Sequence, residues 1–221
     1  MNPALQILIG LGPGTKAAPP FRASTTLNQS TGSTSWVVTV PTNSNDDALI
    51  CALAVVGGGS PTVSQASWTV IDEGFDGAGN TLSIWRRIAS SEPANYTFTI
   101  SVSRQGVATM LSYSGPNTTT PVDVNGVMVF NSAVTDTVAN SVTTTVANDT
   151  VLAITSSGDT TSTYTPPSGF TERVDFQGTG GGMSITVSDK AFAASGATGT
   201  QTTVDSVSAR HSGTLVALRS N

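Results

Sequence analysis

A strictly alternating run near the middle of the chain constrains the fold more than any other stretch. In YTFTISVS, residues 96–103, one side of an extended strand would carry Tyr96, Phe98, Ile100 and Val102, and the other side would carry Thr and Ser. This period of two is typical of a half-buried β-strand. We therefore expect the apolar side to face a core and the hydroxyl side to face solvent or a polar contact.

The rest of the chain also favours β-structure. Only 10% of residues are charged, while Thr, Ser, Val, Gly and Ala are abundant, which suits strands joined by tight polar turns. The helical i, i+3, i+4 pattern never lasts three turns; KAFAASGA, residues 190–197, comes nearest. The run LICALAVV, residues 49–56, is apolar on both faces, which predicts a central strand covered on both sides. Its Cys51, the lone cysteine, is expected to be a buried apolar residue and not a reactive thiol.

Two parts of the chain carry similar landmarks in the same order. Residues 81–113 and 183–218 are both strand–turn–strand segments that end in an apolar run. Asn148-Asp149 stands before an apolar strand as Asn45-Asp46 does. We expect an antiparallel β-sandwich of jelly-roll type, built from two duplicated Greek-key halves. Convergence of two similar Greek keys would give the same pattern.

The first 26 residues are rich in Gly and Pro and predict an extended N-terminal arm. Its apolar residues would be poorly placed in water, so we expect them to dock on the protein's own domain or on a neighbouring subunit. They are Leu5, Ile7, Leu8, Ile9 and Leu11. The expected boundaries are the arm at 1–26 and one sandwich domain at 27–221, with pseudo-repeats at about 35–115 and 141–221 and a bridge at 116–140.

Charge and terminal sequence narrow the range of partners. The net charge of −5 offers no long-range attraction to phosphate backbones, so no nucleic-acid partner is expected. The apolar start of the chain lacks a basic region before Lys16 and is too short to cross a bilayer. We expect no signal peptide, no membrane segment and synthesis in a cytoplasm.

Few residues suggest catalysis. The one histidine, His211, is expected at a surface or interface, with the adjacent Ser212 pointing to the opposite face of its strand. Turn contexts surround most acids and predict Asx-turns or solvated strand ends, as at Asp46, Asp47, Asp149 and Asp159. We predict no catalytic residue, no cofactor and no enzyme activity; a glycosidase would need an acid pair that the pattern does not reveal.

The segment DEGFDGAGN, residues 72–80, has two interpretations. Gly77 and Gly79 suit the loop of a β-hairpin, which is the interpretation we favour. Oxygen ligands on a glycine-rich loop also suit Ca²⁺, although the spacing departs from that of an EF-hand. Those ligands would be Asp72, Glu73, Asp76 and Asn80. We predict no metal site, and the sequence leaves Ca²⁺ binding open.

One tryptophan stands apart from the predicted core positions. Trp85 follows Ile84 and should face the opposite side, next to Arg86 and Arg87. A Trp flanked by two Arg would suit contact with a protein or a glycan. The alternative is a Trp covered by the opposite sheet or by a loop.

Three segments carry a family resemblance. They are ASWTVIDEG, LSIWRRIASSEPANYTFTIS, and MLSYSG with a downstream PVDV. Over residues 46–124 the chain resembles a β-sandwich type found in phage virion proteins, including capsid decoration (cement) proteins and other head or tail accessory proteins. The resemblance implies a jelly-roll subunit, often a homotrimer, that clamps major capsid proteins from outside. It brings no catalytic residues.

Two classes of function follow. The first is a non-enzymatic phage structural protein of the virion, made in the host cytoplasm, that decorates and stabilises the capsid by binding the major capsid protein lattice through its arm and edge strands. The second is a carbohydrate- or receptor-binding module of a phage tail, fibre or surface protein, which would use Trp85 with Arg86 and Arg87, or the loop at residues 72–80.

Overall fold

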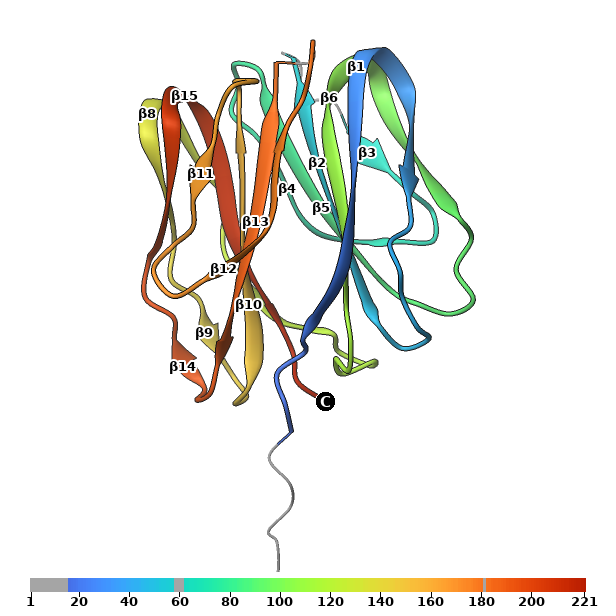
Figure 1. The fold of residues 1–221 in the computed structure, drawn as a ribbon, viewed down its shortest axis with the longest axis vertical. Helices are drawn as coiled ribbons and strands as arrows, with labels where there is room; N and C mark the ends of the chain where they lie inside the picture. The colour runs from blue at the N-terminus through green and yellow to red at the C-terminus, as the bar shows by residue number, and fades with distance from the viewer. Residues whose placement is uncertain (1–15, 58–61, 181) are drawn as a thin grey trace, which may run out of the picture.

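The computed structural model describes residues 16–57, 62–180 and 182–221. In these ranges the chain forms strands and turns and contains no helix, which confirms the predicted all-β class (Figure 1). The described residues therefore include no helix long enough to cross a membrane. The strands are β1 (Phe21–Thr39), β2 (Ala48–Val56), β3 (Val63–Ser64), β4 (Thr69–Phe75), β5 (Asn80–Ile88), β6 (Asn95–Tyr113), β7 (Val122–Asn125), β8 (Val129–Ala139), β9 (Thr143–Thr144), β10 (Asp149–Ser157), β11 (Tyr164–Thr165), β12 (Thr171–Gln177), β13 (Ser184–Phe192), β14 (Gly196–Ala197) and β15 (Gln201–Leu218).

Most strands belong to two antiparallel sheets. The first sheet has the order β1-β6-β2-β5-β4, and β3 also pairs with β6. In the second sheet the order is β11-β15-β10-β13-β12, and β7 and β8 also pair with β15. The short strands β9 and β14 pair with each other. Figure 1 shows the two sheets side by side, with the N-terminal half in blue to green and the C-terminal half in yellow to red.

The two sheets have the same strand order. Strands β8, β15, β10, β13 and β12 take the places of β1, β6, β2, β5 and β4, and β11 takes the place of β3. Small contacts repeat as well, since the amide of Thr62 donates to Ser101 Oγ at 2.9 Å and the amide of Thr163 donates to Ser206 Oγ at 2.9 Å. The correspondence includes β1 and β8. The first repeat therefore starts before the expected residue 35, and the second repeat includes part of the segment at 116–140 that was expected to be a bridge.

In each half, one residue with a left-handed backbone conformation stands just before the central strand. Asp46 (φ 69°) precedes β2 and Asn148 (φ 62°) precedes β10. Their amides donate to the carbonyls of Ala89 and Phe192, at the ends of matching strands, at 2.9 and 2.8 Å. Asp and Asn tolerate this backbone conformation better than most residues with a Cβ. Asn148 therefore corresponds to Asp46, one residue later than the pairing with Asn45 expected from the sequence.

Strand β2 is buried on both faces, as its sequence predicts. One face, with Ile50 and Ala52, packs against β10, β13 and β15 of the second sheet and forms the core between the sheets. The other face, with Leu49 and Cys51, belongs to a second core inside the N-terminal half. Burial raises the pKa of the Cys51 thiol well above its ordinary value, in keeping with the predicted apolar role.

Strands β1 and β6 are each 19 residues long and continue past the central strands as an outer layer. Register shifts interrupt their pairing between Gln29 and Ser35. Beyond this irregularity the two strands cover the second face of β2 with aromatic rings. The buried rings of this second core are Trp36, Trp68, Trp85, Tyr96 and Phe98. Each half of the chain is therefore layered, and β2 lies between two cores.

The alternating run at residues 96–103 is a half-buried strand with one exception. Tyr96, Phe98 and Ile100 are buried, whereas Val102 is 44% exposed. The register of β6 against β1 shifts between Thr99 and Arg104, so Val102 lies in an irregular segment. The expectation that Val102 faces the core was wrong, because a bulge breaks the period of two.

The first sheet includes the last six residues of the expected arm. Strand β1 begins at Phe21 and pairs with the end of β6. Pro19 and Pro20 precede it, and they lack the amide hydrogen that a paired strand uses. The boundary at residue 26 was placed too late, because Thr25 and Thr26 already have the β-branched character of a strand.

Replacement of Gly106 by Ala should destabilise the protein by about 3 kcal/mol or more. Gly106 has φ 151°, and an added Cβ would lie 2.1 Å from the Ala54 carbonyl oxygen and 2.8 Å from Trp36 Cη2. The matched control is Gly77→Ala, where φ is 75° and nothing lies within 4 Å; it should cost about 1 kcal/mol. Urea unfolding of both variants measures the difference, and equal losses would contradict the steric explanation.

Candidate functional site

The contact residues predicted from the sequence fall into two groups. The arm group lies outside the described residues: Leu5, Ile7, Leu8, Ile9 and Leu11. The second group, Trp85, Arg86 and Arg87, lies on β5. The structure does not bring this second group together as one surface spot, since each side chain has a different environment.

Trp85 is a core residue. It is 8% exposed, its Nε1 donates to Ser83 Oγ at 2.6 Å, and its ring packs edge-on against Phe98 at a centroid distance of 6.1 Å. A ring held in this way has no free face for a sugar. Trp85 does face the side opposite Ile84, as expected, but that side is the second core. The structure supports the interpretation of a covered Trp.

The two arginines differ. Arg87 Nε donates to both oxygens of Glu92 at 3.0 Å, and its guanidinium stands 5.5 Å from the Tyr96 ring centroid. This arrangement closes the turn after β5. Arg86 is half-buried, and its side chain forms no hydrogen bond or ion pair with any residue that the structure describes.

The segment at residues 72–80 forms a tighter hairpin than expected. Strand β4 continues to Phe75, so the loop contains only residues 76–79. Asp76 Oδ1 accepts three backbone amides of this loop and its border, at 2.7 to 3.0 Å. Glu73 instead accepts the amide of Val63 at 3.2 Å. Among the described residues, no group of three or more His, Cys, Asp and Glu side chains is placed to hold a metal ion.

His211 is fully buried within β15, so the predicted surface or interface position was wrong. Its Nε2 lies 2.7 Å from Oδ2 of Asp205, which is buried as well. Its Nδ1 has no hydrogen-bond partner among the described residues. The hydroxyl of the adjacent Ser212 bonds that of Ser156 at 2.7 Å. The pair of His211 and Asp205 belongs to the polar interior of the C-terminal half.

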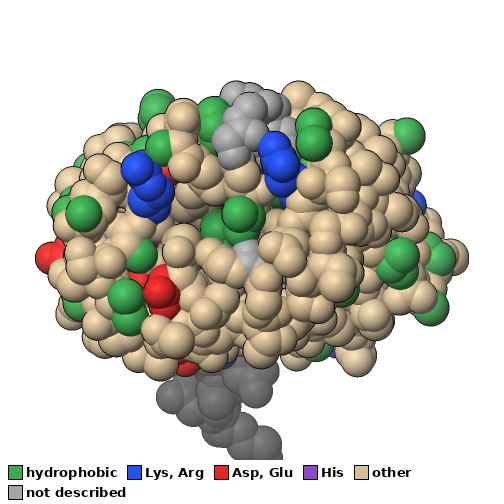
Figure 2. Space-filling model, turned by 90° about the horizontal axis from the view of Figure 1, so that it is seen from above, with side chains coloured by type: hydrophobic (Ala, Val, Ile, Leu, Met, Phe, Trp, Pro, Cys, Tyr) green, Lys and Arg blue, Asp and Glu red, His purple; other side chains and the backbone are tan. Residues whose placement is uncertain are grey.

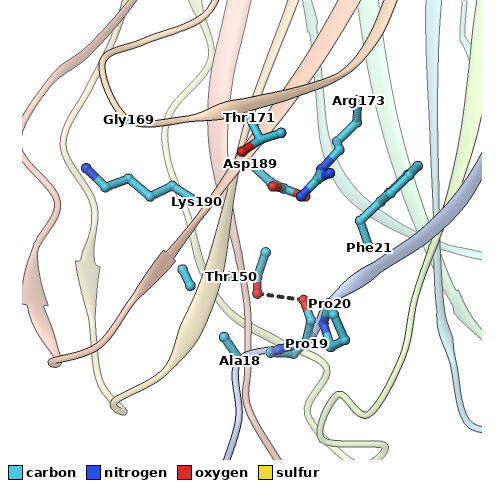
Figure 3. A pocket seen from close by; sticks show the side chains of 11 residues that line it. Ala18, Pro19, Pro20, Phe21, Thr150, Gly169, Thr171, Arg173, Asp189 and Lys190 are labelled. Carbon is cyan, nitrogen blue, oxygen red and sulfur yellow. Dashed lines mark hydrogen bonds and ion pairs between the residues drawn. The ribbon is translucent and has the colours of Figure 1, made fainter.

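A pocket of about 450 Å³ opens where the chain enters the first sheet (Figure 3). The entry segment, residues 18–21, lines one side, and β10, β12 and β13 of the second sheet line the other. Thr150 Oγ1 donates to the carbonyl of Pro19 at 2.7 Å and joins the two sides. Residues far apart in sequence therefore build this pocket.

An ion-paired cluster forms one wall of the pocket. Arg173 Nε and the Tyr113 hydroxyl both donate to Asp189 Oδ2 at 2.9 Å. The hydrogen bond to Asp189 raises the pKa of Arg173. The guanidinium also stands 4.9 Å from the ring centroid of Phe21. Because Tyr113 and Phe21 belong to the first sheet and the other two residues to the second, the cluster fastens the sheets together.

Lys190 forms the opposite wall. Its Nζ stands 5.9 Å from the ring centroid of Phe170 and 5.4 Å from that of Phe192. It forms no hydrogen bond or ion pair with any residue that the structure describes. Figure 3 shows Lys190 and Arg173 on different sides of the pocket, with Asp189 between them. The lining thus has two cations and one carboxylate, and that carboxylate is already bonded.

Two carboxyl groups meet near the same end of the molecule. The carboxyls of Asp123 and Asp149 influence each other's pKa, and Arg219 Nη1 donates to Asp123 Oδ1 at 3.1 Å. Asp149 Oδ1 accepts the amide of Ser220 at 3.2 Å, whereas its buried Oδ2 has no hydrogen-bond partner among the described residues. Asp149 is fully buried, so the solvated strand end expected there was wrong. Burial, then the neighbouring carboxyl of Asp123, raise the pKa of Asp149 to about 6.

Figure 2 looks at the end of the molecule opposite the chain entry. Basic side chains there are separated from each other, a hydrophobic spot lies between them, and most of the surface is uncharged.

Sequence reasoning missed the pocket residues Arg173, Asp189 and Lys190. A weak signal was present, because Asp189 lies in a strand where alternation places it on a buried face. A charge on such a face requires a partner. The partner itself, Tyr113 with Arg173, comes from other strands and has no local signature.

The acid pair predicts a pH-dependent stability. The pKa of Asp149 is higher in the folded protein than its ordinary value of 3.8, so its contribution is present below pH 3.8 and lost as pH rises through about 6. Asp149→Asn should remove this loss and be more stable than the wild type at pH 7.5 by about 1–2 kcal/mol. Urea unfolding from pH 4 to 7.5 measures the difference, with Asp159→Asn as control, because Asp159 is only half-buried. An unchanged pH profile in Asp149→Asn would contradict the raised pKa of Asp149.

Comparison with known proteins assigns no relatives. No protein family matches the chain, and no curated protein or solved structure is significantly similar to it. The resemblance to phage virion proteins therefore stays a prediction from the sequence.

Proposed function

We propose that this protein is a non-enzymatic phage structural protein that decorates the capsid. Its partner would be the lattice of major capsid protein, and it would act as a homo-oligomer, with a trimer implied by the resemblance. The proposal draws on the resemblance of residues 46–124 to virion β-sandwich proteins and on the way the two sheets hold residues 19–21. The protein would be made in the host cytoplasm and would work on the virion surface.

The observation that carries the proposal is the firm attachment of residues 19–21. The carbonyl of Pro19 accepts a hydrogen bond from Thr150, and that of Pro20 accepts the amide of Ser114 at 3.0 Å. The Phe21 ring packs edge-on against Tyr113 at 5.7 Å. A contact made by residues before Lys16 would therefore be tied to both sheets. Weak contacts of this kind add up when they repeat over a lattice.

We also propose that the two halves arose by duplication of one Greek-key unit within a jelly-roll type sandwich. The shared strand order supports this origin. So does the packing between the sheets, where β5 contacts β15 and β6 contacts β13. Strand β13 is the counterpart of β5, and β15 is the counterpart of β6, so each contact becomes the other when the two halves are interchanged. A two-fold relation between equivalent units has this property.

The alternative function is a carbohydrate- or receptor-binding module of a phage tail, fibre or surface protein. Burial of Trp85 removes the ring on which this alternative first relied. The pocket at the chain entry favours it instead, because its lining is concave and polar.

Deletion of residues 1–15 should abolish co-sedimentation of the protein with undecorated capsids, a loss of about a hundredfold or more in affinity if the arm supplies several apolar contacts. The fold should persist, since β1 begins at Phe21. The matched variant keeps the full length and replaces the apolar arm residues by Ser: Leu5, Ile7, Leu8, Ile9 and Leu11.

Both variants should fail to bind while unfolding at the same urea concentration as the wild type. Undiminished binding would remove the arm from the mechanism. Failure of the intact protein to bind capsids would overturn the proposed function.

A further inference from the structure

We propose that the pocket at the chain entry binds a small ligand that carries a carboxylate and hydroxyl groups, of the acidic-sugar class. Lys190 would contact the carboxylate, and Arg173 on the other wall and the threonines of the lining would contact hydroxyls. This proposal does not depend on capsid binding, because the pocket is built wholly from described residues and the arm contacts proposed for the capsid lie before Lys16.

Lys190 is the main reason to expect an anion. Its ammonium has no carboxylate partner among the described residues and is held near two aromatic rings. Gly169 lets the ammonium lie close to the backbone, since a Cβ there would lie only 3.1 Å from Nζ. A cation that is partly removed from water and unpaired gains more from an incoming carboxylate than a fully solvated one.

Arg173 adds donors on the other wall. Only its Nε bonds Asp189, so both Nη groups lack a partner among the described residues. Stacking against Phe21 holds the guanidinium in place. Asp189 itself would repel an anion, but Arg173 and Tyr113 already bond it. The lining therefore has an excess of one positive charge in a chain whose net charge is −5.

The remaining lining suits hydroxyl groups. Thr150 uses its proton to bond Pro19, which leaves its oxygen free to accept a hydrogen bond. Thr171 is exposed at the rim, and its hydroxyl has no partner among the described residues. The volume of about 450 Å³ lies within the range of small-molecule sites. A neutral sugar would leave Lys190 unpaired, and a ligand without hydroxyls would not use the threonines.

The experiment titrates the full chain with sodium glucuronate, glucose and sodium phosphate in separate arms, at low salt. Binding is followed by calorimetry and by amide chemical shifts of β12 and β13. Glucuronate should bind, and glucose and phosphate should each bind about tenfold more weakly or not at all. Added salt should weaken the binding of glucuronate.

Two variants localise the site. Lys190→Gln should weaken glucuronate binding about tenfold, because it removes the charge and keeps much of the side-chain length. Arg86→Gln is the matched control, since Arg86 is also half-buried and unpaired among the described residues but does not line the pocket. It should bind like the wild type.

Absence of shifts in β12 and β13 with glucuronate would overturn the proposal, and so would equal affinity for glucose. Equal affinity for phosphate would overturn the acidic-sugar class. Unchanged affinity in Lys190→Gln would overturn the role of that residue. The amide shifts are read on the wild-type protein, so they decide the question even if the variant fails to fold.

Discussion

Burial of the central strands on both faces is the constraint on which the rest of the structure depends. Every residue of β10 is buried, and β2 is buried except at its last residue. A strand apolar on both faces needs a layer on each side. For β2, the second half of the chain covers one face. Strands β1 and β6 cover the other face, because they continue over the outer side of their own sheet. The length of β1, β6 and β15 follows from this requirement.

The two halves meet this constraint with different chemistry. The second core of the N-terminal half is aromatic, whereas the corresponding apolar cluster of the C-terminal half is smaller and contains no Trp. Buried hydrogen bonds stand beside it, including His211 with Asp205 and Tyr164 with Ser184. Buried polar groups are tolerated when they are paired. The shared strand order is therefore compatible with two unlike interiors.

Three polar features lie near the chain entry. The pocket, the cluster of Arg173, Asp189 and Tyr113, and the acid pair of Asp123 and Asp149 all lie close to where β1 begins or where the chain ends. Each joins segments distant in sequence. The opposite end has separated charges on a mostly uncharged surface (Figure 2). The region around the chain entry is therefore where we expect a binding partner, for the proposed capsid subunit and for the proposed acidic ligand alike.

The sequence by itself determined the β class, the doubly buried strand at residues 49–56, the buried Cys51 and the side of the strand that Trp85 takes. These properties depend on the local period of apolar residues, which each strand carries alone. Tertiary structure decided the burial of His211 and Asp149, the exposure of Val102 and the pocket around Lys190. A bulge or a partner from another strand sets each of these, and neither is encoded in the period of a single strand.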